Sequence, residues 1–317
     1  MLNRMPSNQI AVVGAGAVGC YFGGMLARSG APVTLIGRPA HIDAIARAGL
    51  AIDGVRVNER IPIGATTSLE EGLRDAGVIL FCVKTVSTET AALELRPFLA
   101  PDAAILSMQN GVDNVDRIHA AIGRHAIPVA VYVAAEMTAP GRVTHTGRGD
   151  LVIGHRAGWP HEVDIATLAA MFQQADIPCR ISDDIETELW TKMTLNCAYN
   201  AISALTRAQY GRMVEFPEVR HLMERAVVET VAVARAEGAS LSESEMVETV
   251  FRLAARMTGA TSSTAQDIAR GKPTEIDSLN GYVMRRGVSL GIATPVSEAL
   301  VTLVKLLEDS VVNQRAG

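Results

Sequence analysis

A glycine-rich turn near the start of the chain constrains the fold more than any other feature. The β-branched run of residues 9–13 predicts a strand, and the motif Gly14-Ala15-Gly16-Ala17-Val18-Gly19 follows it directly. A helix is expected over residues 20–28 and a second strand over residues 33–36. In this order, the three glycines permit a tight turn, close approach of a pyrophosphate, and close packing of the helix on the sheet. The N-terminal half is therefore predicted to be a Rossmann-type α/β domain that binds a dinucleotide through residues 14–19.

The residue after the second predicted strand indicates which dinucleotide is bound. NAD-binding domains place a carboxylate there for the ribose 2′-hydroxyl, whereas this chain has Gly37-Arg38. A guanidinium suits the 2′-phosphate of NADP, because it forms bidentate, charge-assisted hydrogen bonds. Lys84 closes the predicted strand 78–83 and is a second candidate for that phosphate, although a solvated lysine explains it nearly as well. The expected cofactor is NADPH.

The rest of the N-terminal half adds strands to the predicted sheet. Strands are expected over residues 103–107 and 128–135, and Asn110-Gly111 follows the first of them. Asn110 is either a turn residue or a ligand at the nicotinamide end of the cofactor. Residues 139–154 alternate in a manner that predicts an antiparallel hairpin completing the sheet.

Composition excludes several classes of function. With 29 basic and 34 acidic residues the net charge is −5, and no basic stripe is interleaved with aromatics, so nucleic acid is not an expected partner. The four cysteines form no CxxC pair, which indicates a reduced compartment without a metal site. No apolar run is long enough to cross a bilayer, and the first residues do not resemble a signal peptide. A cytoplasmic protein is expected.

The C-terminal half changes from strand to helix periodicity. Helices are predicted over residues 186–209, 215–237, 243–256 and 274–308, the last with a break near Gly291. The boundary is placed after Asp183, which gives a cofactor domain over residues 1–183 and an all-α substrate domain over residues 184–317. A cleft between two such domains would be a preferred site for a small ligand.

Three polar residues recur every fourth position in an otherwise apolar helical stretch. Lys192, Asn196 and Asn200 would lie within about 80° on one helix face. Buried without partners, such groups cost about 1 to 3 kcal/mol each, so the face meets either water or a polar ligand. Spacing alone does not decide between these alternatives.

A second polar cluster extends from Ser262 and Ser263 to Asp277. Thr274 and Asp277 resemble a helix-capping pair, which would place Glu275 in a first helical turn, where the helix dipole stabilises a carboxylate. If Glu275 instead faces Lys192, the two residues suit the reduction of a ketone. That reaction needs a hydride from the cofactor and a proton for the developing alkoxide, and a positioned ammonium supplies the proton.

With these motifs the chain resembles the ketopantoate reductase (2-dehydropantoate 2-reductase) family over nearly its whole length. The motifs that carry the resemblance are Gly14–Gly19, Arg38, Lys84, Gln109-Asn110-Gly111, Trp190–Asn200, Ser262-Ser263 with Gln266-Asp267, and Thr274–Asp277. Several motifs in the same order and spacing are more specific than any one of them.

The resemblance implies a role for each candidate residue. Lys192 would be the general acid, and Glu275 would order the lysine, the substrate and the cofactor. The keto acid would be held by Asn110, Asn196, Asn200 and Ser263. Arg38 and Lys84 would favour NADPH, and pantoate, the product, would feed pantothenate and coenzyme A synthesis.

Several alternatives stay open on sequence grounds. Glu136 departs from the small or neutral residue expected near the nicotinamide; it either turns to solvent at a strand end or enters the cleft and selects against a second substrate carboxylate. Another branched 2-keto acid, or the substrate of a hydroxyacid, opine or polyol-phosphate dehydrogenase, would suit a similar two-domain chain. A non-catalytic NADPH sensor has no need for Lys192 and Glu275. The oligomeric state is undetermined, with a homodimer as one candidate.

Overall fold

The β-branched run Gln9–Val13 forms an interior strand of a ten-stranded sheet within the described residues. The computed structural model describes residues 7–161 and 163–316, with side chains to residue 311. The chain divides into two compact units, Met1–Ile185 and Glu186–Gly317. The strands of the first unit are β1 (Gln9–Val13), β2 (Val33–Ile36), β3 (Leu50–Gly54), β4 (Asn58–Ile61), β5 (Gly64–Thr66), β6 (Ala76–Phe81), β7 (Ala104–Ser107), β8 (Ala126–Ala139), β9 (Arg142–Ile153) and β10 (Cys179–Ile181).

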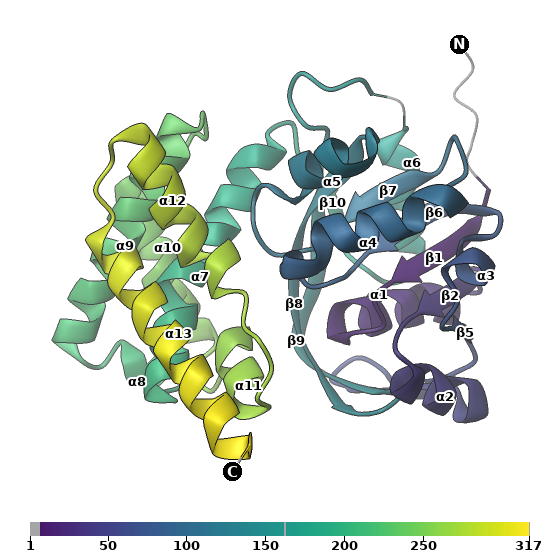
Figure 1. Cartoon of the computed structure of the whole chain (residues 1–317), viewed down its shortest axis with the longest axis horizontal. Coiled ribbons are helices and arrows are strands. Elements are labelled where there is room, and N and C mark those ends of the chain that lie inside the picture. Colours follow the sequence, from purple (N-terminus) through teal and green to yellow (C-terminus); the bar gives the residue numbers. More distant parts are fainter. Residues whose placement is uncertain (1–6, 162, 317) are drawn as a thin grey trace. The chain divides into compact units, whose positions relative to one another are not determined.

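The strand order is β4-β3-β9-β8-β7-β6-β1-β2-β5, and β10 also pairs with β9. Figure 1 shows the run β7-β6-β1-β2-β5 of this order. From β5 to β8 all neighbouring strands are parallel, so their carboxyl ends lie along one edge. Ligands of such sheets bind outside this edge. The predicted Rossmann-type α/β class of the N-terminal half and the helical class of the C-terminal half are confirmed.

The predicted hairpin over residues 139–154 is wrong in detail. This segment is one long strand, β9, which pairs antiparallel with β8. The turn between them is Pro140-Gly141, where Gly141 has a φ of +69°, a conformation that glycine adopts without strain. Gly147 and Gly149 lie near shifts in the β8–β9 register and do not form a second turn.

Helices cover both faces of the sheet because the interior strands are apolar on both sides. Ile10 and Val12 of β1 belong to one core cluster, while Ala11 and Val13 belong to the other. The first cluster includes residues of α1 and α6, and the second includes residues of α4 and α5. The helices of this unit are α1 (Ala17–Arg28), α2 (Pro39–Ala48), α3 (Leu69–Leu73), η1 (Thr85–Ser87), α4 (Thr88–Leu95), η2 (Arg96–Phe98), α5 (Asn114–Ile122) and α6 (Ile165–Gln174).

His145 is a packed histidine of β9. Its ring stacks on Tyr21 of α1, with centroids 4.2 Å apart, and only 2% of the residue is exposed. Burial lowers the pKa of His145, and the positive charge of Arg56 acts in the same direction. The imidazole is therefore held in its neutral form beside Tyr21.

Because His145 is held neutral in this stack, the free energy of unfolding should depend on pH. Because the folded-state pKa of His145 lies below its ordinary value of 6.5, the unfolded chain binds the proton more readily. The stabilisation is present above about pH 6.5 and is lost as the pH falls below it. We expect His145→Phe, which keeps an aromatic ring on Tyr21, to flatten the decline in the free energy of unfolding between about pH 7 and pH 5.5. Urea denaturation across this pH range measures the slope. The variant of the exposed His221, His221→Gln, is the control and should leave the slope unchanged; the same result for His145→Phe would contradict the prediction.

The second unit is helical throughout its regular structure. Its elements are α7 (Ile185–Thr206), α8 (Tyr210–Met213), α9 (Pro217–Ala236), α10 (Glu243–Arg256), α11 (Ser263–Ala269), η3 (Ile276–Ser278), α12 (Asn280–Leu290) and α13 (Pro295–Ala316). Tyr199 of α7 fixes α10, because its hydroxyl donates to the Val250 carbonyl at 2.7 Å. The ring of Tyr199 also packs on Tyr210 of α8, with centroids 4.2 Å apart.

The predicted helix over residues 274–308 is three separate elements. A single 3₁₀ turn, η3, comes first, and Leu279 (φ −107°, ψ −106°) interrupts the backbone before α12 begins at Asn280. The predicted break near Gly291 is present: Gly291 ends α12 in the left-handed conformation, with a φ of +70°. Pro295 then begins α13 at a first-turn position, where its missing N–H costs nothing.

A buried carboxylate holds the start of α13. Glu229 of α9 is 7% exposed and accepts hydrogen bonds from the backbone N–H groups of Val296 (2.7 Å) and Ser297 (2.8 Å). Both N–H groups lie in the first helical turn, where they have no partner within the helix and where negative charge is stabilised.

We expect Glu229→Gln to lower the free energy of unfolding by about 2 kcal/mol, because a carboxamide can accept only one of these hydrogen bonds through its oxygen. The other backbone N–H then faces an NH₂ group. Glu224→Gln, on the same helix, is the control; its partner His221 is 3.9 Å away and both side chains are exposed, so a change below about 0.5 kcal/mol is expected. Equal urea midpoints for the two variants would contradict the capping role.

Candidate functional site

The turn between β1 and α1 and the first turn of α1 each require a glycine for packing. Gly14 has a φ of +109°, and a Cβ atom there would lie 2.8 Å from the carbonyl carbon and oxygen of Cys82. A Cβ atom on Gly19 would lie 2.2 Å from the Gly14 carbonyl oxygen. Both contacts are shorter than real Cβ contacts allow, so any side chain would push α1 away from β1 and β6.

Gly16 has a different environment. No heavy atom lies within 4 Å of the position that its Cβ would occupy, and Gly16 is the N-cap of α1 without a side-chain cap. The first turn of α1 contains no acidic residue, and Ala15, Ala17 and Val18 add no polar side chain. Open space at a helix N-terminus, with unpaired N–H groups and no competing carboxylate, fits a pyrophosphate. The loop therefore fits the predicted dinucleotide.

Arg38 lies two residues beyond the end of β2. It is exposed and is the N-cap of α2, which begins with Pro39 and has no acidic residue in its first turn. Gly37 is held in place because its N–H donates to the Thr66 carbonyl, and a Cβ on Gly37 would lie 2.6 Å from that of Ala15. Arg38 therefore lies at the carboxyl edge of the sheet, and its role toward an NADP 2′-phosphate stays a prediction.

Lys84 lies farther from its strand than the sequence predicted, because the strand ends two residues before the expected end at Val83. The strand β6 ends at Phe81, and Lys84 lies three residues farther on, exposed, as the N-cap of the short helix η1. The strand ends early because the backbone of Cys82 packs against the Gly14 turn. Lys84 still lies on the loop that follows a parallel strand, so its role toward the cofactor phosphate stays a prediction.

Asn110 lies on the loop that follows β7, the strand beside β6. Its carbonyl oxygen accepts hydrogen bonds from Thr85 Oγ1 (2.8 Å) and from Asn114 Nδ2 (2.7 Å). Gly111 has a φ of +104°, so the Asn110-Gly111 pair is a turn. The turn and the ligand hypotheses are therefore compatible, because the turn holds the Asn110 backbone between two loops at the carboxyl edge.

A buried polar network that sequence reasoning missed connects these two loops. Gln109 is 5% exposed, and its Nε2 donates to Thr88 Oγ1 at 2.8 Å. Thr88 Oγ1 in turn donates to the Thr85 carbonyl at 2.8 Å. A sequence signal for this network was present: two threonines follow one buried strand, and the polar pair Gln109-Asn110 follows the next strand.

Glu136 does not lie at a strand end. The strand β8 continues to Ala139, and Glu136 is half-buried opposite Thr144 of β9. Long pairing with β9 extends β8 beyond the predicted end at Ala135. The effect of Glu136 on substrate choice stays a prediction.

In the second unit, the predicted polar stripe lies on one continuous helix. The helix α7 runs from Ile185 to Thr206, so Lys192, Asn196 and Asn200 share a face. Lys192 and Asn196 are half-buried, and Asn200 is 3% exposed. A solvated helix face does not fit Asn200, which is removed from water.

Ser262, not Ser263, connects the second polar cluster to this stripe. Ser262 is 1% exposed, and its Oγ donates to the Asn200 carbonyl at 3.1 Å while capping α11 through the Ala265 N–H. The Ser262 N–H also donates to Ser203 Oγ at 3.3 Å. Ser263 is the exposed first residue of α11. Its predicted role in substrate binding would therefore depend on an exposed hydroxyl next to the anchored Ser262.

Glu275 is a buried carboxylate, 7% exposed, immediately before η3. The predicted capping arrangement is wrong: Thr274 Oγ1 accepts from the N–H of Ile276, two residues on, and the Thr274 N–H donates to Glu308 Oε1 of α13 at 2.6 Å. This turn competes with a helical start and leaves Glu275 outside any α-helix.

The segment after Glu275 is attached to the stripe helix by Asn280. This residue is fully buried, and its Nδ2 donates to the Cys197 carbonyl of α7 at 3.2 Å. Trp190 of α7 also packs against Tyr282, with ring centroids 6.0 Å apart. Residues 275–282 therefore lie along the part of α7 that carries Lys192 and Asn196. No sequence motif indicated this role for Asn280.

This helical half-site has the groups that a carbonyl reduction needs. An ammonium, two amides and a carboxylate come from one helix and from the segment attached to it. Amides hydrogen-bond a carboxylate or hydroxyl, and an ammonium stabilises and protonates an alkoxide. Among the residues that the structure describes, no group of histidine, cysteine and acidic side chains could hold a metal ion.

Comparison with known proteins supports both halves of this description. The family model described as "Ketopantoate reductase PanE/ApbA" matches residues 10–158, and the model of its C-terminal part matches residues 184–308. The chain belongs to the ketopantoate reductase family. The family resemblance inferred from the sequence motifs is thereby confirmed.

Curated and structural relatives agree with the family. A 2-dehydropantoate 2-reductase of Halobacterium salinarum is 34% identical over 309 residues, which cover 95% of this chain and 99% of the relative. The crystal structure of a ketopantoate reductase from Ralstonia eutropha JMP134 is 44% identical and covers 96% of this chain and 99% of its own, with a TM-score of 0.88.

A second solved structure differs in its described chemistry. D-Mandelate dehydrogenase, in a ternary complex with NADH and anilino(oxo)acetate, has a TM-score of 0.89 and 25% identity, covering 96% of this chain and 99% of its own. This relative therefore pairs the same fold with another cofactor and another 2-oxo acid.

Proposed function

We propose that this chain reduces 2-dehydropantoate (ketopantoate) to pantoate with NADPH. The observation that carries the proposal is the α7 stripe with its ammonium and amides, fixed to the segment that bears the buried Glu275. The curated relatives named for this reaction support it. We propose residues 1–183 as the cofactor domain and residues 184–317 as the substrate domain, a boundary two residues before that between the two compact units.

The proposed roles follow from the chemistry of each group. NADPH, when bound at residues 14–19 with Arg38 and Lys84 at its 2′-phosphate, supplies the hydride. Lys192 donates a proton to the carbonyl oxygen as that oxygen gains charge, so that ketone, hydride and proton together give the alcohol. Asn196, Asn200, Ser263 and Asn110 hold the substrate carboxylate and hydroxyl through hydrogen bonds. Glu275 orients the Lys192 ammonium and contributes to cofactor binding.

A second candidate is a dehydrogenase of another branched or aromatic 2-hydroxy acid, favoured by the likeness to D-mandelate dehydrogenase. The reacting unit, a carbonyl beside a carboxylate, is the same in both candidates. Arg38 weighs against NADH as the cofactor of this chain, because a guanidinium there suits the 2′-phosphate.

A single assay separates these candidates. Oxidation of NADPH and NADH is followed with ketopantoate, benzoylformate and a series of aliphatic 2-keto acids. We expect the highest kcat/KM for ketopantoate with NADPH. Turnover of benzoylformate with NADH, together with no turnover of ketopantoate, would replace the proposed substrate and keep the reaction type. NADPH binding without turnover of any keto acid would support a sensor.

The proposal places the enzyme in the cytoplasm as a homodimer. Its four cysteines are free thiols, which suits a reducing compartment. None of the described helices combines the length and the apolar character needed to span a bilayer. Leu303 and Leu306 of α13 are exposed one turn apart, which supports an interface on this helix. Light scattering of Leu303→Asp and the parent protein tests the assembly.

A further inference from the structure

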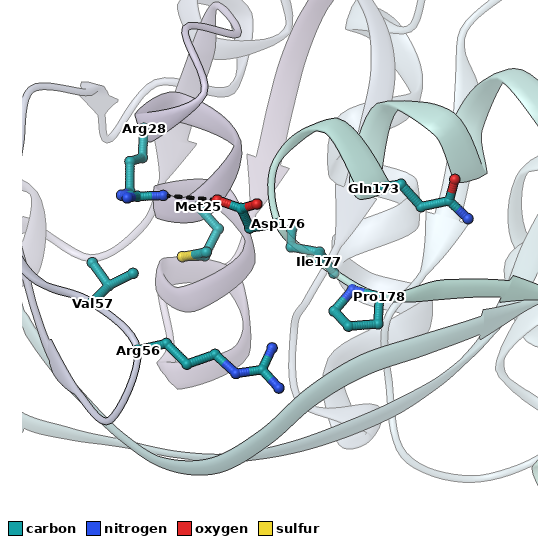
Figure 2. Close-up of a pocket in the computed structure, with 8 residues that line it drawn as sticks. All are labelled: Met25, Arg28, Arg56, Val57, Gln173, Asp176, Ile177 and Pro178. Carbon is teal, nitrogen blue, oxygen red and sulfur yellow. Dashed lines mark hydrogen bonds and ion pairs between the residues drawn. The ribbon is translucent and has the colours of Figure 1, made fainter.

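A cavity of about 450 Å³ opens on the first unit, at the C-terminal end of α1. Its walls come from α1, from the turn between β3 and β4, and from the chain between α6 and β10 (Figure 2). Ligand sites for small molecules span about 300 to 1,000 Å³, so the cavity has the size of a small-molecule site.

The cavity does not belong to the proposed cofactor site. The twelve-residue α1 has its N-terminus at the glycine loop and ends at Arg28, which lines the cavity. At about 1.5 Å per residue, the two ends of α1 are about 18 Å apart. A dinucleotide on residues 14–19 therefore leaves the cavity without an explanation.

The two guanidinium groups of the cavity differ in their pairing. Arg28 donates to Asp176 at 3.1 Å and to Glu59 at 3.2 Å, so its charge is compensated. Arg56 is exposed on the β3–β4 turn, and within the described part of the chain no residue forms a hydrogen bond or an ion pair with it. Figure 2 shows the Arg28–Asp176 contact and the Arg56 side chain extending along the cavity toward Pro178.

The remaining walls restrict the kind of anion. Met25, Val57 and Pro178 contribute apolar side chains to the lining, and Figure 2 shows Pro178 nearest to the Arg56 guanidinium. The Asp176 carboxylate, already paired with Arg28, would repel a second negative charge on the ligand. We propose that this cavity is a second ligand site, separate from the proposed active site, which binds a small aliphatic monocarboxylate through Arg56. The planar guanidinium matches a carboxylate in a bidentate manner, and the aliphatic body packs on the apolar side chains.

The pKa of His145 should report whether the cavity is occupied. Arg56 is close enough to the Tyr21–His145 stack for its charge to lower the pKa of His145. A carboxylate paired with Arg56 would offset that charge, so the pKa of His145 should rise when the site is filled. The same measurement on Arg56→Gln, in which this pairing is lost, distinguishes the signal from binding at α7.

Isovalerate, a branched aliphatic monocarboxylate, is the probe. It is titrated into the full-length protein by calorimetry, and the pKa of His145 is measured by NMR with and without the probe. The Lys192→Ala background weakens binding to the proposed substrate groups. We expect saturable binding that is at least about tenfold weaker in Arg56→Gln, unchanged in the exposed control Arg74→Gln, and absent for neutral isovaleramide. Keto-acid turnover of Arg56→Gln should equal that of the parent.

Several results would overturn the proposal. They are absent or non-saturable isovalerate binding, equal affinity in Arg56→Gln, equal affinity for isovaleramide, and an unchanged His145 pKa in the saturated protein. Tighter binding of inorganic phosphate than of isovalerate would overturn the carboxylate assignment. Thermal unfolding of Arg56→Gln confirms that the variant is folded. None of these outcomes depends on which keto acid the enzyme reduces.

Discussion

Replacing Lys192 with alanine should lower kcat by about 10² to 10⁴, the usual contribution of a positioned general acid, with NADPH affinity nearly unchanged. The difference arises because the proton is needed only as charge develops on the carbonyl oxygen, whereas the cofactor fingerprint lies in the first unit. Single-turnover kinetics with ketopantoate, together with NADPH binding by fluorescence, measure the two quantities separately.

Two further variants sharpen this result. Lys192→Arg keeps the positive charge, but a guanidinium does not give up a proton in proteins, so kcat should stay low if the ammonium supplies the proton. Thr191→Ala is the matched control; its hydroxyl donates to the Thr187 carbonyl one turn earlier, and its turnover should be near that of the parent. Activity of Lys192→Ala equal to that of the parent would falsify the general-acid role.

Replacing Arg38 with glutamine should weaken NADPH binding by about 10- to 10⁴-fold and leave NADH binding within about threefold. The 2′-phosphate would lose up to two charge-assisted hydrogen bonds, each contributing about 1.5 to 3 kcal/mol, whereas NADH has no group there. Arg38 is exposed at the carboxyl edge of the sheet, so the change should not disturb the core. Calorimetric titration with both cofactors checks this.

The same helix offers a control for charge. Arg47 of α2 is also exposed, and its Nε donates to the Asp43 carbonyl one turn earlier. Arg47→Gln removes the same charge from the opposite end of α2 and should change NADPH affinity less than threefold. If the two variants lose affinity equally, the effect is the net charge of the unit and Arg38 has no specific contact.

The strands and the glycine loop could be predicted because local rules decide them. The turn at Gly14 needs a positive φ, and β1 and β2 have the bounds expected from their β-branched runs. Predictions failed where contacts outside an element's own residues decided its end. Pairing with β9 carries β8 past Glu136, and packing of Cys82 on Gly14 ends β6 before Lys84.

By itself the sequence determined which polar groups lie on one face of α7, because residues four apart on a helix share a face in any tertiary context. It likewise determined a glycine loop with space for a phosphate at Gly16. Only the tertiary structure decided that Ser262 anchors Asn200 and that Asn280 anchors Cys197, across 62 and 83 residues of chain. Such contacts depend on how helices pack, and burial of Glu275 depends on them too. No local pattern encodes them, because neighbouring residues such as Ser262 and Ser263 are chemically identical until one is enclosed.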